Sequence, residues 1–591
     1  MTDPVRIANC SGFFGDRLSG AREMVEGGPI DVLTGDWLAE LTMLILSRIR
    51  AKRPGGGFAS TFVTQMEQVM GTCLDRGIKV VSNAGGLDPA GCAEAVQEVA
   101  DRLGVAPTIA YVDGDDLMPR LAELSAAGAI ARFDDGTAEE LGDLERALTA
   151  NAYLGCWGIV EALSQGADIV ITGRVTDAAV TCGPAAWHHG WARDDWDALA
   201  GAVVAGHVIE CSAQATGGNY SFFREVPGME RLGFPWAEIA ADGSSVIGKH
   251  DGTGGQVSIG TVTSQLLYEI GGPRYLGPDV TARFDTIRLD EIGPDRVRIS
   301  DTQGEPPPST LKVATNELGG FRNSVAIALT GLDIEAKADV VSAAFWRACP
   351  FTPDDFASVD TRLIRTDHAD PDSNEAATAQ LRITVKDPDE RKVGRAFSNA
   401  FVETALASIP GLYGLGGGPS AAAPYGVYRP ATVPSDLVPA YVHVGNRTVQ
   451  VDSVAPQAGS DRTDGGASGP APAADDLGDV PTERRPIGDV VGARSGDKGG
   501  NANVGVFART DEGFDWLSGF LTVDRFRELL PETADLAVDR FDLPNVRSLN
   551  FVVHGLLQEG VAASTRVDAQ AKSLGEWLRA RVVDVPVALL D

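Results

Sequence analysis

Paired cysteines, basic charge and long apolar runs are all scarce in this sequence of 591 residues. Its seven cysteines are widely scattered and none forms a C-x-x-C pair, which argues against a disulfide framework and indicates buried, reduced thiols in a cytoplasmic protein. No apolar run approaches the length that spans a bilayer. The N-terminal stretch "MTDPVRIANCSGFFGD" lacks a charged region followed by an apolar one, so we expect no signal peptide.

The charge balance is strongly acidic. The sequence has 82 Asp and Glu residues against 50 Lys and Arg residues, and its formal net charge is -32. Because such a chain repels phosphate backbones and anionic lipid headgroups, we expect neither nucleic acid nor a membrane as partner. A hydrophobic content of 43% with 22% charged residues is typical of a soluble globular protein. The length predicts about three or four domains.

Signatures of several common enzyme classes are missing. The histidines show neither H-E-x-x-H nor a regular spacing of ligands, so we expect no bound metal. The absence of G-x-S-x-G and G-x-G-x-x-G argues against a serine hydrolase and a nicotinamide-dependent dehydrogenase. A P-loop-like match, Gly243-x-x-x-x-Gly248-Lys249, is followed by His250 where a nucleotide site needs a hydroxyl residue for magnesium. The Asp-Gly pair at 242–243 predicts a β-hairpin instead.

The first half of the chain alternates apolar strands with helix-like segments. Glycine-rich turns separate them, as in "IKVVSNAGG" followed by "LDPAGCAEAVQEVADRLG". That helix has clear end signals, because Asp88 is a natural N-cap, Pro89 takes the first helical position and Gly104 is suited to the stop. We therefore predict an α/β domain over residues 1–324, with a doubly wound, mostly parallel sheet.

Three further segments follow this domain. Residues 325–452 mix helix-like stretches with strands that are partly antiparallel, which predicts an α+β continuation. Residues 453–486 are rich in Pro, Gly, Ala and Asp and poor in large apolar groups, which is typical of a flexible linker. Residues 487–591 predict a small α+β domain of their own.

Acidic residues and glycines follow the predicted strands at the point where each strand ends. Because open α/β sheets bind ligands beyond the carboxyl ends of their strands, we expect these turns to form one ligand crevice. The alternative is that each is only a strand-to-helix turn with an N-cap. The residues expected on the rim are Asp16, Asp36, Gly85, Gly86, Arg174 and Asp177.

Glu210 is the leading candidate for catalysis. It ends an apolar run in "ECSAQATGGNYSFF", where Gly217, Gly218 and Asn219 follow in a turn. A carboxylate beside amide donors could exchange protons with a carbonyl compound while Asn219 or backbone N–H groups stabilise an oxyanion. A buried glutamate bonded to a turn is the structural alternative. Asp177 and Asp16 complete the candidate catalytic set.

Two other segments could hold an anion. Arg174, at a strand end in "ITGRVTDAAV", could clamp a carboxylate or phosphate, or it could pair with Asp177 as part of the structure. Near the P-loop-like match, Lys249 and His250 precede a glycine turn whose amides could form a backbone nest for an anionic oxygen. The nest would be formed by the amides of Gly252 to Gly255, of which Gly254 and Gly255 are the expected ligand-binding residues.

The stretch "GARSGDKGGNANVGVFAR" at the start of the C-terminal domain combines closely spaced glycines with charged side chains. Glycines let backbone amides approach a ligand closely, and Arg494, Ser495 and Lys498 would favour an anion. We expect this loop to cover the crevice of its own chain or of a neighbouring subunit. The competing interpretation is an exposed hairpin with a local Arg494–Asp497 ion pair.

Several stretches of the sequence resemble those of a known family. "NAGGLDP", "YLGCWGIVEAL", "ITGRVTDAAV" and "GTGGQVSIGTVTSQLLYEIGGPRYLGPDV" look like parts of the acyclic terpene utilisation AtuA family. The C-terminal stretch, with "LPNVRSLNFVVHGLLQEG", is similar to the ferredoxin-like domain that often follows it. Members accompany acyl-CoA carboxylases, hydratases and dehydrogenases in the breakdown of citronellol, geraniol and branched acids.

The resemblance implies a CoA thioester or its acid as the ligand. We expect a hydratase or carbon–carbon lyase that uses acid/base chemistry, with CoA as part of the substrate and no tightly bound cofactor. The alternative is a non-catalytic acyl-CoA-binding or scaffold subunit of a carboxylase or hydratase system. A homo-oligomer in the cytoplasm is expected in either case.

Overall fold

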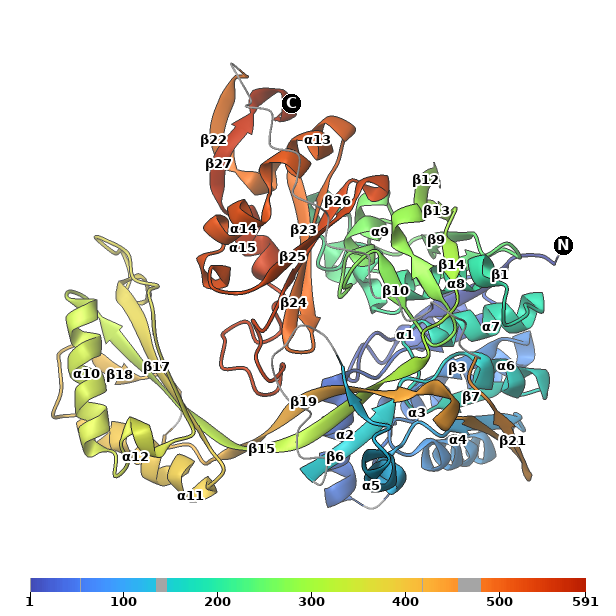
Figure 1. The fold of residues 1–591 in the computed structure, drawn as a ribbon, viewed down its shortest axis with the longest axis horizontal. Coiled ribbons are helices and arrows are strands. Elements are labelled where there is room, and N and C mark those ends of the chain that lie inside the picture. Colours follow the sequence, from blue (N-terminus) through green and yellow to red (C-terminus); the bar gives the residue numbers. More distant parts are fainter. Residues whose placement is uncertain (1, 54, 134–145, 417, 455–479, 591) are drawn as a thin grey trace. The chain divides into compact units, whose positions relative to one another are not determined.

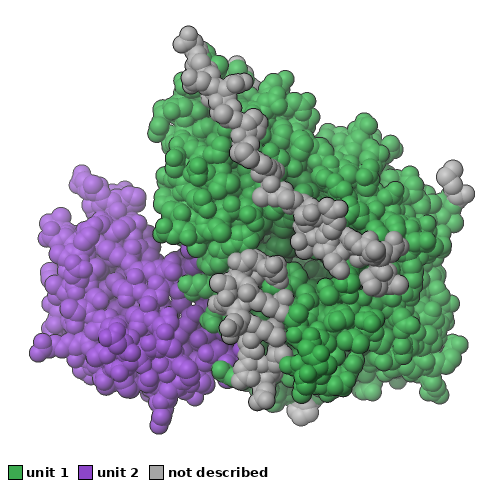
Figure 2. Space-filling view, in the orientation of Figure 1, with its two compact units in different colours: residues 1–316, 428–561, 568–591 green, residues 317–427, 562–567 purple. Residues whose placement is uncertain are grey.

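The computed structural model describes residues 2–53, 55–133, 146–416, 418–454 and 480–590. These residues form two compact units, coloured separately in Figure 2: residues 1–316, 428–561 and 568–591 in the first, and residues 317–427 with 562–567 in the second. The sequence analysis placed a domain boundary at 324/325 and a second at 452/453. In the structure the strands of residues 440–451 instead join the large sheet of the first unit.

A large mixed sheet organises the first unit (Figure 1). In order across the sheet, its eleven strands in the described residues are β12 (Arg288–Gly293), β13 (Arg296–Ser300), β9 (Ser245–Lys249), β8 (Pro235–Ile239), β1 (Val5–Asn9), β2 (Val32–Gly35), β3 (Lys79–Ser82), β7 (Ile169–Thr172), β4 (Ile109–Asp113), β20 (Ala440–Val444) and β21 (Arg447–Val451).

The prediction of a mostly parallel sheet needs correction. Strands β1, β2, β3, β7 and β4 pair in parallel, but every other ladder described in this sheet is antiparallel. Three hairpins cause the difference, and one of them, β12–β13, pairs with β9. The β8–β9 hairpin, which turns at Asp242–Gly243 as predicted, adds antiparallel strands beside β1, and the β20–β21 hairpin adds them beside β4.

Both faces of the parallel strands are buried. Side chains alternate along each strand, so Ile7 and Val81 enter one apolar cluster while Ala8 and Val80 enter the other. The alternation explains why these strands read as nearly continuous apolar runs in the sequence. The α-helices described before residue 317 are α1 (Gly20–Gly27), α2 (Glu40–Lys52), α3 (Ser60–Arg76), α4 (Pro89–Leu103), α5 (Leu121–Ala126), α6 (Trp157–Ser164), α7 (Ala179–His189), α8 (Trp196–Ile209) and α9 (Ile259–Leu266).

Helix α4 begins and ends where the sequence predicts. The side chain of Asp88 accepts a hydrogen bond from the Gly91 N–H, Pro89 is the first helical residue, and Gly104 adopts the left-handed conformation after the last turn. Strands outside the large sheet are β5 (Ala131–Arg132), β6 (Ala147–Ala152), β10 (Arg274–Leu276), β11 (Thr281–Arg283), β14 (Gln303–Glu305) and the longer β19 (Ala423–Pro434).

The second unit packs helices on antiparallel strands, as the sequence pattern indicates. Strand β17 pairs with both β16 and β15, and Phe345 and Phe397 anchor the core between helices and sheet. The elements are β15 (Thr310–Thr330), α10 (Ile334–Ala348), β16 (Ser358–Ile364), β17 (Thr378–Asp387), α11 (Glu390–Val393), α12 (Arg395–Thr404) and β18 (Leu412–Gly414).

The C-terminal domain contains an antiparallel sheet in the order β23-β24-β26-β25. The predicted linker lies largely outside the described residues, and its last part, β22, is a strand that pairs with β27. The elements are β22 (Thr482–Pro486), β23 (Val491–Lys498), β24 (Asn501–Ala508), α13 (Asp511–Phe520), α14 (Val523–Leu529), β25 (Val538–Leu543), β26 (Ser548–Val553), α15 (Leu574–Arg579) and β27 (Val582–Pro586).

The cysteines agree with the prediction of reduced thiols. All seven lie in the described residues and are free, and Cys211 alone among them is not fully buried. Across the described ranges, no helix has both the length and the apolar composition needed to cross a bilayer.

Two helical glycines allow a matched test of packing around α8. A side chain at Gly201 in α8 would overlap the backbone of Gly243 in the β8–β9 turn, whereas Gly71 in α3 faces open space. We expect Gly201→Ala to lower the free energy of unfolding by about 1–3 kcal/mol, because backbone atoms must move. Gly71→Ala should raise it by about 0.5–1 kcal/mol through helix propensity. Urea unfolding measures both, and equal effects would contradict the close α8–turn contact.

Candidate functional site

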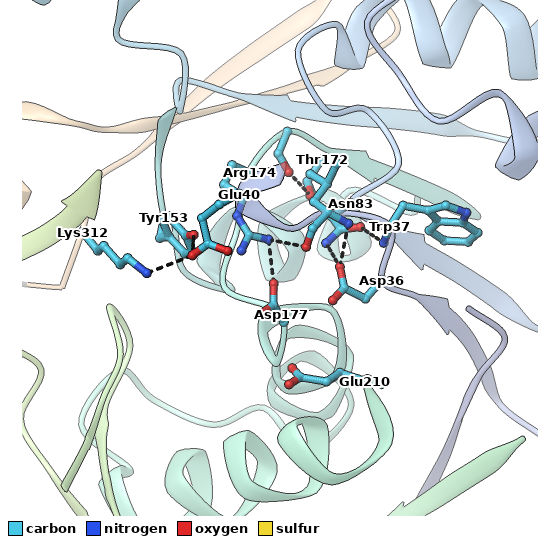
Figure 3. Close-up of polar contacts among 12 residues, drawn as sticks. Asp36, Trp37, Glu40, Asn83, Tyr153, Thr172, Arg174, Asp177, Glu210 and Lys312 are labelled. Carbon is cyan, nitrogen blue, oxygen red and sulfur yellow. Dashed lines mark hydrogen bonds and ion pairs between the residues drawn. The ribbon is translucent and has the colours of Figure 1, made fainter. Parts of the chain in front are cut away.

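Polar residues from separate loops meet at the carboxyl ends of the parallel strands (Figure 3). Asp36 follows β2, Asn83 follows β3, Asp115 follows β4 and Arg174 follows β7. The parallel pairing of these strands places their carboxyl ends at one edge of the sheet, where the loops can share hydrogen bonds.

Asp36 and Asn83 are bonded to each other and to the backbone around them. The Asn83 amide donates to Asp36 Oδ1 and accepts from the Trp37 N–H at 2.8 Å. The Leu38 N–H donates to the same Asp36 oxygen at 3.1 Å. Both side chains are buried, so these bonds fix the orientation of the Asp36 carboxylate.

Arg174 is the most buried cation of the site, with only 2% of its surface exposed. Its Nη1 donates to Asp177 Oδ1 at 2.6 Å and to the Leu38 carbonyl at 3.1 Å. Its guanidinium also lies over the ring of Tyr153, 4.2 Å from the centroid. Behind it, Asp115 accepts from the Arg174 N–H and from Asn151, which anchors the loop to β4. Arg174 therefore does pair with Asp177, as one interpretation of the sequence held.

Glu210 reaches the same site from the end of α8. Its backbone continues the helix, with its N–H donating to the Gly206 carbonyl at 2.9 Å. The Asn9 amide, at the end of β1, donates to the carbonyls of Ile209 and Glu210 and ties the helix end to the sheet. The Glu210 side chain is 9% exposed, and its Oε2 has no hydrogen-bond partner among the described residues. His207, one turn earlier, lies 3.4 Å from the other oxygen.

The carboxylates of Asp36, Asp177 and Glu210 converge. One oxygen from each lies within 4.8 Å of the others, and Figure 3 shows the three groups facing a common point. Burial, followed by the charge of Asp177, raises the pKa of Glu210 and of Asp36 well above their ordinary values. Burial also raises the pKa of Asp177 despite the opposing effect of Arg174. Burial lowers the pKa of His207 to about 4, so this imidazole is neutral near pH 7.

A second polar group adjoins the cluster on the side of Tyr153. The Tyr153 hydroxyl donates to Glu40 Oε1 at 2.9 Å, and Lys312 Nζ donates to the same oxygen at 3.1 Å. Burial alone would raise the pKa of Glu40, but the charges of Lys312 and Arg174 hold it well below its ordinary value. Since Arg174 and Lys312 both contact the ring of Tyr153, two cations lie close together beside the three carboxylates.

The glycine-rich stretch of the C-terminal domain is a β-hairpin that packs against the α/β domain. Strands β23 and β24 pair from Val491 to Ala508, and Gly499 and Gly500 form the turn between them. Gly496 lies against Tyr268, and Gly505 lies against Leu267, where side chains would overlap. The glycines thus permit close approach to another part of the chain, and their approach to a ligand stays a prediction.

Charged side chains of this hairpin contact protein groups. Arg494 bonds to Gln214 and lies over the Tyr268 ring, 4.2 Å from its centroid. Lys498 donates to the Glu269 carbonyl at 3.0 Å. The Ser495 hydroxyl accepts from the Gly575 N–H at 3.0 Å. The local Arg494–Asp497 ion pair is not formed among the described contacts.

Lys572 joins the two parts of this interface. It bonds to the hydroxyl of Tyr268 and lies 3.2 Å from Glu269 Oε1 and 3.5 Å from Asp497 Oδ1. Burial, followed by the charge of Glu269, raises the pKa of Asp497 to about 7. The charge of Glu269 also contributes to the raised pKa of Glu210, so the interface influences the carboxylate cluster electrostatically.

Other predicted site residues make separate contacts. Asp16 accepts from the N–H groups of Gly12 and Arg17 within its own loop, and Asn219 donates to Gln214. Lys249 pairs with Asp295 at 3.1 Å, and His250 lies 2.9 Å from the Met24 carbonyl. In the described part of the chain none of these four bonds to the cluster of Asp36, Asp177 and Glu210. Their proposed roles stay predictions.

The predicted glycines occupy tight turns. An added side chain would overlap Thr172 and Pro89 at Gly85, Leu46 at Gly86, and Val226 at Gly217. At Gly218 and Gly254 it would meet backbone atoms, as it would at Gly255, whose φ is +95°. These contacts with protein atoms are enough to explain the glycine at each position, so the glycines by themselves are not evidence of a ligand. Gly85 lies next to the Thr172 carbonyl, at the end of β7 and two residues before Arg174.

Several residues of the site were not predicted from the sequence, among them Glu40, Asn83, Tyr153 and Lys312. Asn83 had a signal, because it stands in the quoted turn "NAGGLD" at a strand end. The others had none, since Glu40 lies in a helix, Lys312 lies in a strand and Tyr153 precedes a helix-like run. Their sequence separation from Arg174 hides the contact.

Removing the Arg174 charge tests the role of this buried cation. We expect Arg174→Met to lower the free energy of unfolding by about 3–5 kcal/mol, because Asp177 then faces two carboxylates without a partner. Arg509→Met is the control, since Arg509 pairs with Glu225 while both are about half exposed; it should cost at most about 1 kcal/mol. Urea unfolding compares them, and a similar small loss in both would show that Arg174 is not structurally important.

Comparison with known proteins assigns the chain to a family. The model of the acyclic terpene utilisation family protein AtuA matches residues 5–444, and the model of the AtuA ferredoxin-like domain matches residues 485–584. Neither a curated protein nor a solved structure matches the chain. The first match includes every residue of the carboxylate cluster and the second includes the hairpin at 491–508. The chain therefore belongs to the acyclic terpene utilisation AtuA family and carries the family's ferredoxin-like domain at its C-terminal end.

Proposed function

We propose that this chain is an enzyme of acyclic terpenoid or branched-chain acid breakdown that acts on a CoA thioester as a hydratase or carbon–carbon lyase. The observation that supports the proposal is the convergence of three carboxylates, of which Asp36 and Glu210 are buried, beside Arg174 at the carboxyl ends of the parallel strands. Family membership supports the role in acyclic terpene utilisation. Buried charge at this edge of a sheet is typical of a reaction centre rather than of a structural core.

The charges of the site suit this chemistry. Hydration or cleavage next to a thioester carbonyl moves a proton at carbon and places negative charge on the carbonyl oxygen. Arg174 and Lys312, which share the ring of Tyr153, would stabilise that oxygen or the carboxylate of a branched acid. The cluster of Asp36, Asp177 and Glu210 supplies the opposite charge on the other side of Arg174.

The CoA part of the substrate has less support. Phosphate contacts by Arg494, Ser495 and Lys498 stay a prediction, because each of these residues contacts a protein group in the structure. A homo-oligomer likewise stays a prediction. The second candidate function is an acyl-CoA-binding or scaffold subunit, which the extensive packing of the ferredoxin-like domain on residues 267–269 would also suit.

Turnover by the purified chain separates these two functions. We expect the full-length chain, supplied with a synthetic branched enoyl-CoA or its hydrated form, to add water, remove it or cleave the acyl chain. Mass spectrometry of the thioesters follows the reaction. Saturable binding without turnover across a series of branched thioesters would instead identify a binding or scaffold subunit.

Replacing Glu210 tests the reaction centre. Glu210→Gln keeps the shape of the side chain but removes its charge, so we expect turnover to fall at least about a hundredfold while the protein stays folded. Glu161→Gln in α6, where Glu161 bonds to Gln165, is the control and should leave turnover unchanged. Circular dichroism checks the fold of both. Full activity in Glu210→Gln would return Glu210 to a structural role.

A further inference from the structure

The geometry of the carboxylate cluster matches that of a metal site. Three oxygens, one each from Asp36, Asp177 and Glu210, lie within 4.8 Å of one another. Three oxygens no more than 4.8 Å apart lie within about 2.8 Å of a common centre, close to the distances of about 2.0–2.6 Å at which Mg²⁺ and Ca²⁺ bind oxygen. The three side chains therefore need only small shifts to reach ligand distance from a common point.

Each carboxylate presents an oxygen that no described residue occupies. The hydrogen bonds to Asp36 and the bond from Arg174 to Asp177 all fall on the Oδ1 atoms. Glu210 Oε2 is buried without a partner in the described chain, and Figure 3 shows its carboxylate directed towards Asp177 and Asp36. A buried carboxylate oxygen without a partner is costly, so its retention at this point indicates a ligand.

The neighbours of the cluster leave its negative charge uncompensated. Asp177 has a cationic partner in Arg174, but the donors to Asp36 are the amide of Asn83 and the backbone N–H of Leu38. Three carboxylates this close together, two of them buried, repel one another beside a single guanidinium. A bound cation would remove this repulsion and satisfy the free oxygens together.

We propose that Asp36, Asp177 and Glu210 bind one divalent cation of the Mg²⁺ or Mn²⁺ type. All three ligand atoms are carboxylate oxygens. Such a donor set suits hard cations such as Mg²⁺ and Mn²⁺ better than it suits zinc or copper. Asn83 and Arg174 hold the Oδ1 atoms of Asp36 and Asp177 and would orient the ligands from behind. The sequence predicted no metal, because its histidines lack ligand spacing and carboxylates from distant loops leave no comparable pattern.

This site lies in the reaction centre of the proposed function and would place a cation beside Arg174 and Tyr153. Its occupancy nevertheless depends only on the three carboxylates, so metal binding can be measured without any substrate.

Manganese binding tests the inference on the full-length chain. After treatment with EDTA, we expect the protein to bind one Mn²⁺ per chain, detected by loss of the free-ion signal in electron paramagnetic resonance, and Mg²⁺ to compete. Glu210→Gln and Asp36→Asn should each weaken binding at least about tenfold. Asp279→Asn is the matched control, since Asp279 is an equally buried carboxylate that accepts from the Cys156 N–H, and it should bind as the wild type does.

Circular dichroism identifies any variant that fails to fold. In that case Asp177→Asn is measured instead of the unfolded variant, because the Asp177 side chain is 30% exposed. Absence of stoichiometric Mn²⁺ binding by the folded wild type would overturn the inference, as would equal affinity in the wild type and every folded ligand variant. Stoichiometric binding that the ligand variants lose supports the inference even if no acyl-CoA is turned over, in which case the proposed function alone fails. Turnover by a chain that binds no Mn²⁺ would reject the cation and keep the function.

Discussion

The guanidinium of Arg174 is the interaction on which the rest of the site depends. It joins the end of β7 to the loop after β2 through the Leu38 carbonyl, and it binds Asp177 at the start of α7. Because it is buried, its charge acts at low dielectric on Asp36, Glu40 and Glu210 alike. Without this cation, the loops that carry the carboxylates would have no common partner.

Carboxyl groups near that cation have pKa values that are shifted in opposite directions. Glu40, held by Lys312 and Tyr153, has its pKa lowered, whereas Asp36 and Glu210 have theirs raised by burial and by Asp177. Chemically similar side chains of one site thus have pKa values that are shifted in opposite directions. Acid/base catalysis needs groups whose pKa values differ in this way. A cation bound at the three carboxylates would also stabilise their charged forms.

The ferredoxin-like domain is attached to the α/β domain by backbone packing as much as by charge. Glycines in β23 and β24 let the hairpin lie directly on residues 267–268, and Asn503 donates to the Leu267 carbonyl and accepts from the Glu269 N–H. Lys572 and Lys498 then bind around Glu269. This attachment links the position of a second domain to the electrostatics of Glu210, whose pKa responds to Glu269.

Local signals in the sequence determined local structure. The caps of α4, the β8–β9 hairpin at Asp242–Gly243, the apolar parallel strands and the position of Asp36 and of Arg174 just after a strand all follow from residues close in the chain. The antiparallel additions to the sheet, the roles of Glu40, Tyr153 and Lys312, and the convergence of Glu210 with two aspartates were decided only by the tertiary structure. The physical reason is that these contacts join residues far apart in the chain, and no periodicity or spacing encodes which distant side chains burial will bring together.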